Sequence, residues 1–212
     1  MKKMRIVTAT VKNQLEFMNM TLLGQSLNLF PRHTGLEITV FANNSGEGKK
    51  GLSTIYNTML KQAKGDEILL FVHDDVYIHD WHLVHRLNEA AMHFDIIGLA
   101  GNTDPDYSEP SWALAWNREK HPKGRQPIKN FSGVVGHLVH GKTHISAYGP
   151  LPQECRLIDG LFIAVNAGKI NDSGVLFDPQ FEYHFYDLDF CRQCTGKGLR
   201  IGPWPIAVTH AS

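Results

Sequence analysis

The feature that most constrains the fold is an almost wholly apolar segment, residues 67–72, that runs directly into the polar triplet His73-Asp74-Asp75. A strand that is apolar on both faces belongs in the centre of a parallel sheet covered by helices. Two adjacent carboxylates at the end of such a strand are costly unless they are solvated, hydrogen-bonded or bound to a metal ion. The triplet therefore predicts either a solvated turn or a metal-binding site.

The preceding residues supply the other elements that such a sheet requires. Residues 5–10 and 37–42 are rich in β-formers and predict strands, whereas residues 13–29 and 52–63 space their apolar side chains as helices do. Gly65 is expected to cap the second helix at its C-terminus. The order strand–helix–strand–helix–strand predicts an α/β fold, with a mostly parallel central sheet flanked by helices.

In sheets of this kind, ligands bind beyond the carboxyl ends of the strands. That rule places four polar residues on one rim of the predicted sheet. They are Thr8, Asn43, Asp74 and Asp75.

The second half of the chain is different in kind. Residues 101–149 are rich in Pro, Gly, His and Trp and predict long binding loops with a small hairpin around residues 134–139. Regular structure is expected again at residues 156–165, in a helix at 186–197, and in a last strand at 206–209 that precedes His210. Without a repeat or a linker, residues 1–212 are expected to form one domain, divided near residue 100.

Composition excludes several classes of protein. Lys+Arg and Asp+Glu both number 21, so no net charge attracts nucleic acid or an anionic membrane, and a phosphate-bearing ligand must be held locally. No segment approaches the roughly 18 apolar residues of a membrane helix, and no signal peptide is evident. We expect a cytoplasmic protein, or one peripheral at the inner face of the membrane. The three cysteines predict no disulfide framework, and Cys191 and Cys194 are expected to be semi-buried helix thiols.

Two acidic clusters carry the candidate chemistry. Asp74 and Asp75 offer the hard oxygen ligands that suit Mg²⁺ or Mn²⁺, with substrate phosphates completing the coordination shell. Asp187 and Asp189 precede or begin a predicted helix, where the N-terminal dipole stabilises anions. They are either helix-capping acids or, if one points into a cleft, a general base. Trp112 and Trp116 lie in the irregular segment, where aromatic rings either stack on sugars or fill a loop core.

These residues carry a family resemblance that spans the chain in order. The run Gly51-Leu52-Ser53-Thr54-Ile55-Tyr56-Asn57, a helix, an apolar strand and then His73-Asp74-Asp75 resemble the donor-binding half of family 2 glycosyltransferases, with His in the first place of their D-x-D motif. Tyr186-Asp187-Leu188-Asp189 is similar to their E-D-x-D helix, and His210 to their terminal metal-binding histidine. The chain most resembles the streptomycin-biosynthesis-type subgroup of these GT-A enzymes.

The resemblance implies an inverting, metal-assisted transfer of a sugar from a nucleotide-diphosphate donor, with UDP favoured, to a glycan or lipid-linked acceptor in polysaccharide biosynthesis. Residues 1–100 would bind the donor nucleotide, and residues 101–212 the acceptor. The implied roles are metal ligation by Asp75 and His210, donor binding by Thr8, Asn43, Asn57, His73 and Asp74, general base catalysis by Asp187, and sugar or acceptor contacts by Asp159, Gly160, Tyr186, Trp112 and Trp116. His73 and Asp74 would contact the ribose or support the metal.

Two other interpretations remain open. A module of the same fold could bind a nucleotide sugar or a glycan without catalysis, in which case Asp187 would point away from Asp75. A histidine-based metal-dependent hydrolase is the second, because the chain has 12 histidines, including two groups that a second metal ion could use. These groups are His79, His82 and His85, and His137, His140 and His144.

Overall fold

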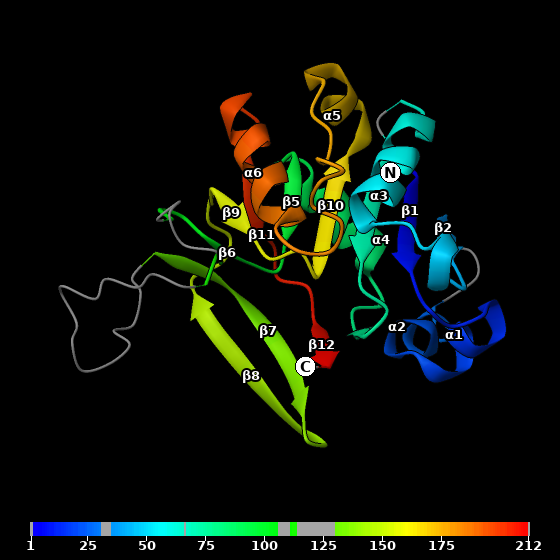
Figure 1. Ribbon diagram of the computed structural model, residues 1–212. Coiled ribbons are helices and arrows are strands. Elements are labelled where there is room, and N and C mark those ends of the chain that lie inside the picture. Colours follow the sequence, from blue (N-terminus) through cyan, green and yellow to red (C-terminus); the bar gives the residue numbers. More distant parts are fainter. Residues whose placement is uncertain (1, 31–34, 66, 106–110, 114–129, 212) are drawn as a thin grey trace, which may run out of the picture.

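The computed structural model describes residues 2–30, 35–65, 67–105, 111–113 and 130–211, which form two sheets with helices beside them (Figure 1). The strands are β1 Met4–Ala9, β2 Leu36–Phe41, β3 Ile68–Val72, β4 Val76–Ile78, β5 Ile96–Gly98, β6 Ala100–Asn102, β7 Phe131–Val139, β8 Lys142–Gly149, β9 Leu157–Ile158, β10 Phe162–Asn166, β11 Ile201–Pro203 and β12 Val208–Ala211. The helices are α1 Gln14–Met20, α2 Leu22–Leu27, α3 Leu52–Gln62, α4 Leu83–Ala90, α5 Ala167–Ser173 and α6 Tyr186–Gly196, with a 3-10 turn at Gly46–Gly48.

The first sheet has the order β11-β5-β10-β3-β1-β2, and every strand except β10 runs in the same direction. The apolar strand β3 lies in the middle and is buried along its whole length, as expected from its composition. The predicted mostly parallel sheet with flanking helices is thus confirmed. Because β1 and β3 run in parallel from the same edge, their carboxyl ends face the second sheet (Figure 1).

The predicted helix over residues 13–29 is wrong in one respect, because the chain forms two helices. Helix α1 ends before Thr21, whose hydroxyl then accepts a hydrogen bond from Gly24 N at 3.0 Å and caps α2. A Cβ at Gly24 would lie 1.9 Å from the carbonyl oxygen of Phe17, so this sharp turn requires glycine. Apolar periodicity alone did not reveal the break.

The cap predicted at Gly65 is also wrong in detail. Helix α3 ends at Gln62 with Ala63 in an extended conformation at the C-cap, and Gly65 adopts a left-handed φ of 57° two residues later. The glycine therefore shapes the turn into β3 and does not terminate the helix itself.

The second sheet has the order β4-β12-β7-β6-β9, with β8 paired to β7. The small hairpin predicted around residues 134–139 is in fact long, since β7 and β8 together span residues 131–149 and extend away from the first sheet (Figure 1). Strand β12 lies between β4 and β7, so the last residues of the chain return to the turn that follows β3. This return brings His210 to the predicted rim.

An aromatic cluster fixes helix α6 against α3 and β3. Tyr56 stacks on Phe71 with ring centroids 4.3 Å apart, and Phe177 stacks on Phe190 at 3.9 Å. Such rings bury large apolar areas and hold their neighbours in a specific geometry. Cys191 and Cys194 lie in the same region as free thiols and are fully buried, deeper than predicted.

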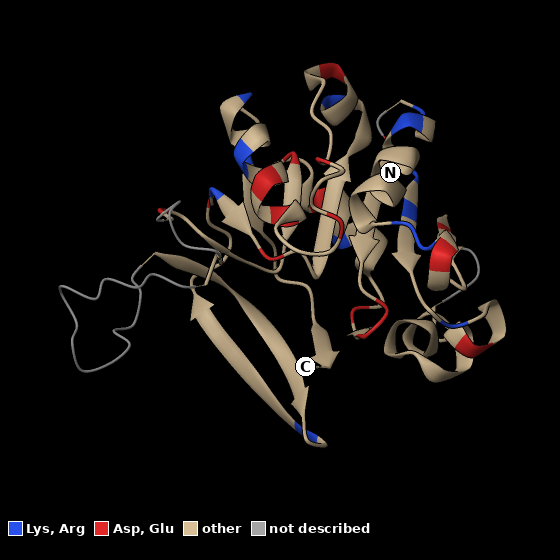
Figure 2. Cartoon of the chain, viewed as in Figure 1, with Lys and Arg blue, Asp and Glu red and all other residues tan. Residues whose placement is uncertain are grey.

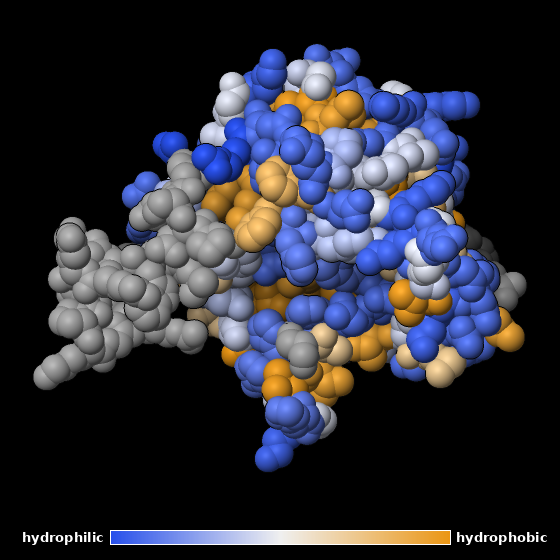
Figure 3. All heavy atoms as spheres, in the orientation of Figure 1, coloured by the Kyte–Doolittle hydropathy of each residue, from blue (hydrophilic) through white to orange (hydrophobic). Residues whose placement is uncertain are grey.

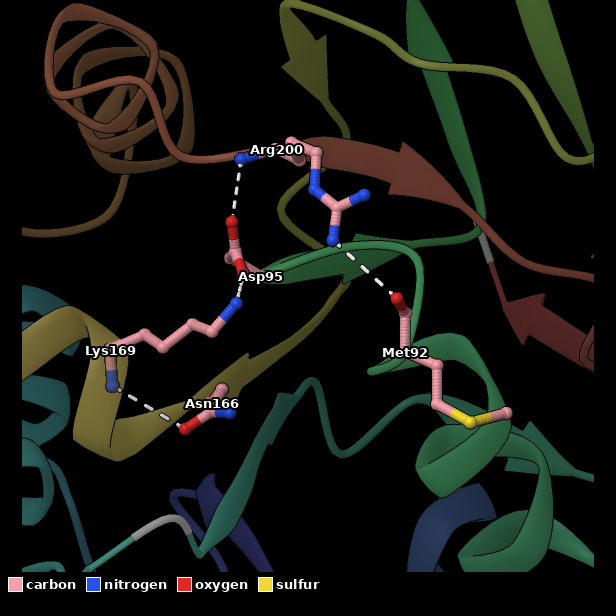
Figure 4. Close-up of polar contacts among 5 residues, drawn as sticks. All are labelled: Met92, Asp95, Asn166, Lys169 and Arg200. Carbon is pink, nitrogen blue, oxygen red and sulfur yellow. Dashed lines mark hydrogen bonds and ion pairs between the residues drawn. The ribbon is translucent and has the colours of Figure 1, made fainter.

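The buried Asp95 holds together three segments at the end of the first sheet away from the triplet (Figure 4). Its carboxylate accepts a hydrogen bond from Arg200 N at 2.8 Å and forms an ion pair with the Lys169 ammonium group. The Arg200 guanidinium donates to the carbonyl of Met92 at 3.5 Å, and Asn166 accepts from the Lys169 amide. These contacts tie α5 and β11 to β5.

We expect Asp95→Ala to lower the free energy of unfolding by about 2 kcal/mol, because the Arg200 amide loses a charged acceptor and the half-exposed Lys169 loses its partner. Urea unfolding followed by circular dichroism measures the change. Asp172→Ala removes an exposed carboxylate from α5 and is the matched control, with an expected change within about 0.5 kcal/mol. Equal stability of the two variants would show that the cluster in Figure 4 adds no stability.

Among the described residues, no helix combines the length and the apolar character needed to cross a bilayer.

Candidate functional site

A tight turn after β3 presents the triplet. The Val76 amide donates to the carbonyl of His73 at 3.3 Å, and the His73 amide donates to the carbonyl of Leu161 at 3.1 Å. The carbonyl of Asp75 accepts from the Ala211 amide at 3.0 Å. The backbone therefore joins the end of β3, the start of β10 and the end of β12 at one point.

The turn and β12 bring together three side chains that can hold a metal ion. One ligand atom from each of His73, Asp75 and His210 lies within 4.8 Å of the others. Oδ2 of Asp75 is 3.4 Å from Nε2 of His210, whereas Oδ1 of Asp75 is buried and has no hydrogen-bond partner in the described part of the chain. A buried carboxylate oxygen without a partner is unfavourable, and a cation would satisfy it.

The ionisation of Asp75 suits a cation. Burial opposes the charge on Asp75, but the contact with His210 and the proximity of His73 outweigh it and hold the pKa of Asp75 below its usual value. The same contact with Asp75 raises the pKa of His210. Asp75 is therefore an anion over the physiological range, as metal ligation requires.

Tyr186 fixes the orientation of His73. Its hydroxyl donates to the carbonyl of Gly160 at 2.9 Å and lies 2.8 Å from Nε2 of His73. Because the carbonyl can only accept, the hydroxyl hydrogen is used there, and Nε2 of His73 is the donor in the second contact. Burial lowers the pKa of His73, which favours the neutral ring with its lone pair on Nδ1.

A pocket of about 250 Å³ lies beside this group. Its lining includes His73, Trp112, Asp159, Gly160 and Asp187. Burial, followed by the nearby charge of Asp159, raises the pKa of Asp187 to about 6. The Trp112 indole donates to Oδ2 of Asp159 at 2.7 Å and so orients this carboxylate beside Asp187.

Gly160 permits the close approach of β10 and α6 at this pocket. A Cβ at this position would lie 2.6 Å from the Tyr186 hydroxyl and 2.9 Å from Oδ2 of Asp187. We expect Gly160→Ala to lower the free energy of unfolding by about 1–3 kcal/mol, because both side chains must move. Thermal unfolding measures the change, with Gly196→Ala, where nothing lies within 4 Å, as the control. Equal midpoints would mean that the pocket is looser than the structure indicates.

The other predicted donor residues differ in their surroundings. Thr8 is fully buried at the end of β1, and its hydroxyl has no partner among the described residues, whereas Asn43 adopts a left-handed φ of 53° after β2. The side-chain amide of Asn57 is paired with the backbone of Phe177, at 2.7 Å and 2.9 Å, which is a structural arrangement. Asp74 follows His73 in the turn, and Trp116 lies outside the described residues. Their roles in binding stay predictions.

Sequence reasoning did not foresee two contacts. The pairing of Trp112 with Asp159 joins residues 47 positions apart, and the bridge from His73 to Tyr186 joins residues 113 positions apart. The residue types show that each side chain can form a hydrogen bond, but the partners are far apart in the sequence and no local motif predicts the pairing.

The histidine groups do not form separate metal centres in the described structure. His79 follows β4 and contacts Thr209, His82 precedes α4, and His85 lies within α4, so these three histidines do not lie on one helix. Among the described residues, the group of His73, Asp75 and His210 is the one with metal-binding geometry. In the described part of the chain, these two histidine groups therefore give the hydrolase interpretation no support.

No protein-family model and no curated protein matches the sequence. Solved structures similar to the chain include GalNAc-T7 with UDP, GalNAc and Mn²⁺, at a TM-score of 0.61 and 11% identity over 99% of this chain. TarS 1–349 of S. aureus in complex with UDP is similar at a TM-score of 0.52 and 15% identity over 100% of this chain. The chain spans 43% and 61%, respectively, of the lengths of those chains.

This similarity establishes the fold. The chain has the α/β fold of GT-A glycosyltransferases. At such low identity, the activity, substrates and partners of this chain have to be inferred from its own site.

Proposed function

We propose that this protein is a metal-dependent glycosyltransferase that moves a sugar from a nucleotide-diphosphate donor, with UDP favoured, to a hydroxyl group of an acceptor. The observation that carries the proposal is the placement of the His73–Asp75–His210 group next to the pocket that contains Asp187. The structures of similar fold that contain UDP, one of them with Mn²⁺, support the choice of donor and metal.

The three side chains fit Mn²⁺ better than Mg²⁺. Carboxylates suit both ions, but two imidazoles beside one carboxylate favour a transition metal over Mg²⁺, which prefers oxygen ligands and retains water. The unpartnered Oδ1 of Asp75 and the neutral ring of His73 supply ligand atoms. When bound, the cation would neutralise charge that develops on the departing diphosphate.

The protein side chains supply the remaining chemistry. Asp187, with a pKa of about 6, is ionised at neutral pH and would remove the proton from the acceptor hydroxyl as its oxygen attacks the anomeric carbon. Attack from the face opposite the leaving group inverts the anomeric centre. Asp159, held by the Trp112 indole, raises the basicity of Asp187 and would position the sugar hydroxyls.

The proposal extends to the organisation of the chain. Residues 1–100 would bind the nucleotide of the donor at the carboxyl ends of β1, β2 and β3, and residues 101–212 would provide Asp187 and bind a glycan or lipid-linked acceptor. Thr8 and Asn43 lie at the ends of β1 and β2, in keeping with the first assignment. Membership of the streptomycin-biosynthesis-type subgroup and a part in polysaccharide biosynthesis complete the proposal.

A donor-turnover assay tests the proposed function. The protein is incubated with UDP-, GDP- and dTDP-sugars in the presence of Mn²⁺, and release of nucleoside diphosphate is measured with water as the acceptor. We expect slow release from one class of donor, absent with EDTA, and a released sugar whose anomeric configuration is inverted by proton NMR. Retention of configuration would contradict the role of Asp187, and binding without turnover of any donor would favour a non-catalytic module.

A further inference from the structure

Three histidines form a row across the second sheet beside the proposed metal site. His210 on β12 is the register partner of His137 on β7, and His137 is the register partner of His144 on β8. The ring centroids are 6.3 Å apart for the first pair and 5.0 Å apart for the second. Register partners on adjacent strands project from the same face of a sheet, so the row continues directly from the candidate ligand His210.

The middle histidine has an unsatisfied ring nitrogen. Nε2 of His137 is buried and has no hydrogen-bond partner among the residues that the structure describes. A buried polar atom without a partner costs free energy, and native structures rarely retain one unless a water, an ion or a ligand satisfies it. The described neighbours of this ring in the row are other imidazoles, and beyond His210 lies the carboxylate of Asp75.

We propose that His137 is a further protein ligand of the metal site formed by His73, Asp75 and His210. This inference rests on the metal site of the proposed function and adds a fourth protein ligand to it. The ligand atoms of the first three residues already lie within 4.8 Å of one another, and the ring of His137 would turn toward His210 to join them. A site with three imidazoles and one carboxylate binds a transition metal without help from a nucleotide.

The orientation of His144 argues against a separate site made by the hairpin. Its ring stacks on that of His137 with an interplanar angle of 20°. Imidazole lone pairs lie in the ring plane, so two stacked rings do not direct them at one ion. His144 instead packs against His137 as a supporting side chain.

In the described part of the chain, the strands and the pocket beside the metal site offer no basic side chain for a phosphate. Strands β7 and β12 contain no Lys or Arg (Figure 2). The described residues that line the neighbouring pocket also include neither. On the hairpin, hydrophobic spheres lie above a hydrophilic tip (Figure 3). The side chains of Val134 and Ile145 in this hairpin are exposed. A fourth protein ligand would keep the cation bound before the donor arrives, so that the cation can then bind the phosphates.

The test measures metal binding to the nucleotide-free protein after chelation of endogenous metal. Calorimetry with Mn²⁺ compares the wild type with His137→Gln, and Co²⁺ titration records the visible absorption bands, which report the ligand set. We expect His137→Gln to weaken Mn²⁺ binding at least about 10-fold and to change the Co²⁺ spectrum. His144→Gln, in the same row, and His140→Asn, in the hairpin turn, are the controls and should change affinity less than about 3-fold.

Wild-type affinity and an unchanged Co²⁺ spectrum in His137→Gln would overturn the inference, as would a wild type that binds neither metal. Thermal midpoints without metal, expected to be equal, exclude a folding defect in the variant. A parallel titration with UDP separates this inference from the proposed function. If UDP binds with Mn²⁺ but His137→Gln keeps full metal affinity, only the inference fails. If metal binding depends on His137 but no nucleotide binds, the inference holds and the proposed function fails.

Discussion

Replacement of Asp75 by alanine is expected to weaken Mn²⁺-dependent binding of UDP about 100-fold, or roughly 2.7 kcal/mol. Asp75 is the one carboxylate in the three-residue group, and its buried Oδ1 has no partner among the described residues. Its removal takes away the carboxylate of this group and leaves neutral imidazoles, which hold a divalent cation more weakly beside a dianionic diphosphate. Calorimetric titration of UDP with and without Mn²⁺ measures the effect.

The neighbouring Asp74 provides the matched control for this prediction. Asp74 lies one position earlier in the same turn but is not part of the three-residue group. We expect Asp74→Asn to keep the dependence on Mn²⁺ and to change UDP affinity much less. A large loss in Asp74→Asn with none in Asp75→Ala would reassign the metal ligand within the triplet.

Replacement of Asp187 by asparagine is expected to reduce transfer about 10³-fold while UDP affinity stays within about 3-fold of the wild type. The amide preserves the shape of the side chain and removes its basicity, so only the chemical step should suffer. Steady-state kinetics and calorimetry measure the two quantities. Asp189→Asn is the control, because Asp189 lies two residues later in α6 and accepts a hydrogen bond from Gln193 at 2.6 Å.

The same variant should be more stable than the wild type at neutral pH. The pKa of Asp187 is raised from 3.8 to about 6, so its contribution to stability is fully present below about pH 4 and is lost as the pH rises through 6. That difference corresponds to at most roughly 3 kcal/mol, which Asp187→Asn would recover at pH 7.5 and not at pH 4. The rate of donor turnover by the wild type should instead fall as the pH is lowered through about 6, because Asp187 is then protonated and cannot act as a base.

Two results would contradict the predicted effects of pH on stability and turnover. A thermal midpoint for Asp187→Asn equal to that of the wild type at pH 7.5 would show that burial of the carboxylate carries no cost. A turnover rate that stays constant between pH 5 and 8 would remove Asp187 from the proton transfer.

The sequence predicts the parts of this fold that depend on local pattern. The buried strand β3, the strands β1 and β2, and helices α3 and α6 lie within a few residues of their predicted positions, because each has a clear apolar period and recognisable ends. The division of residues 13–29 into two helices depends on the contact of Gly24 with Phe17, which periodicity does not reveal. The length of the β7–β8 hairpin depends on its pairing with β6 and β12.

In the candidate site too, the sequence predicts some features, whereas others depend on tertiary structure. His73, Asp75 and His210 were all singled out from the sequence, since residue type and order along the chain are enough to suggest a metal site. Their distances, the tautomer of His73 set by Tyr186, and the pairing of Trp112 with Asp159 are tertiary properties. His137 appeared in the sequence only as one member of a histidine group, and its register with His210 gave it a distinct role.

The most direct test of the central claim is a thermal-shift panel of UDP, GDP, CDP and dTDP, each with and without Mn²⁺. A ligand at about 100 times its dissociation constant adds roughly 2.7 kcal/mol of stability, which raises the midpoint of a protein of this size by several degrees. We predict such a shift for UDP only when Mn²⁺ is present, and no shift for UDP with Mn²⁺ in Asp75→Ala. Absence of a shift for all four nucleotides with Mn²⁺ would contradict the proposal that this site binds a nucleotide-diphosphate sugar.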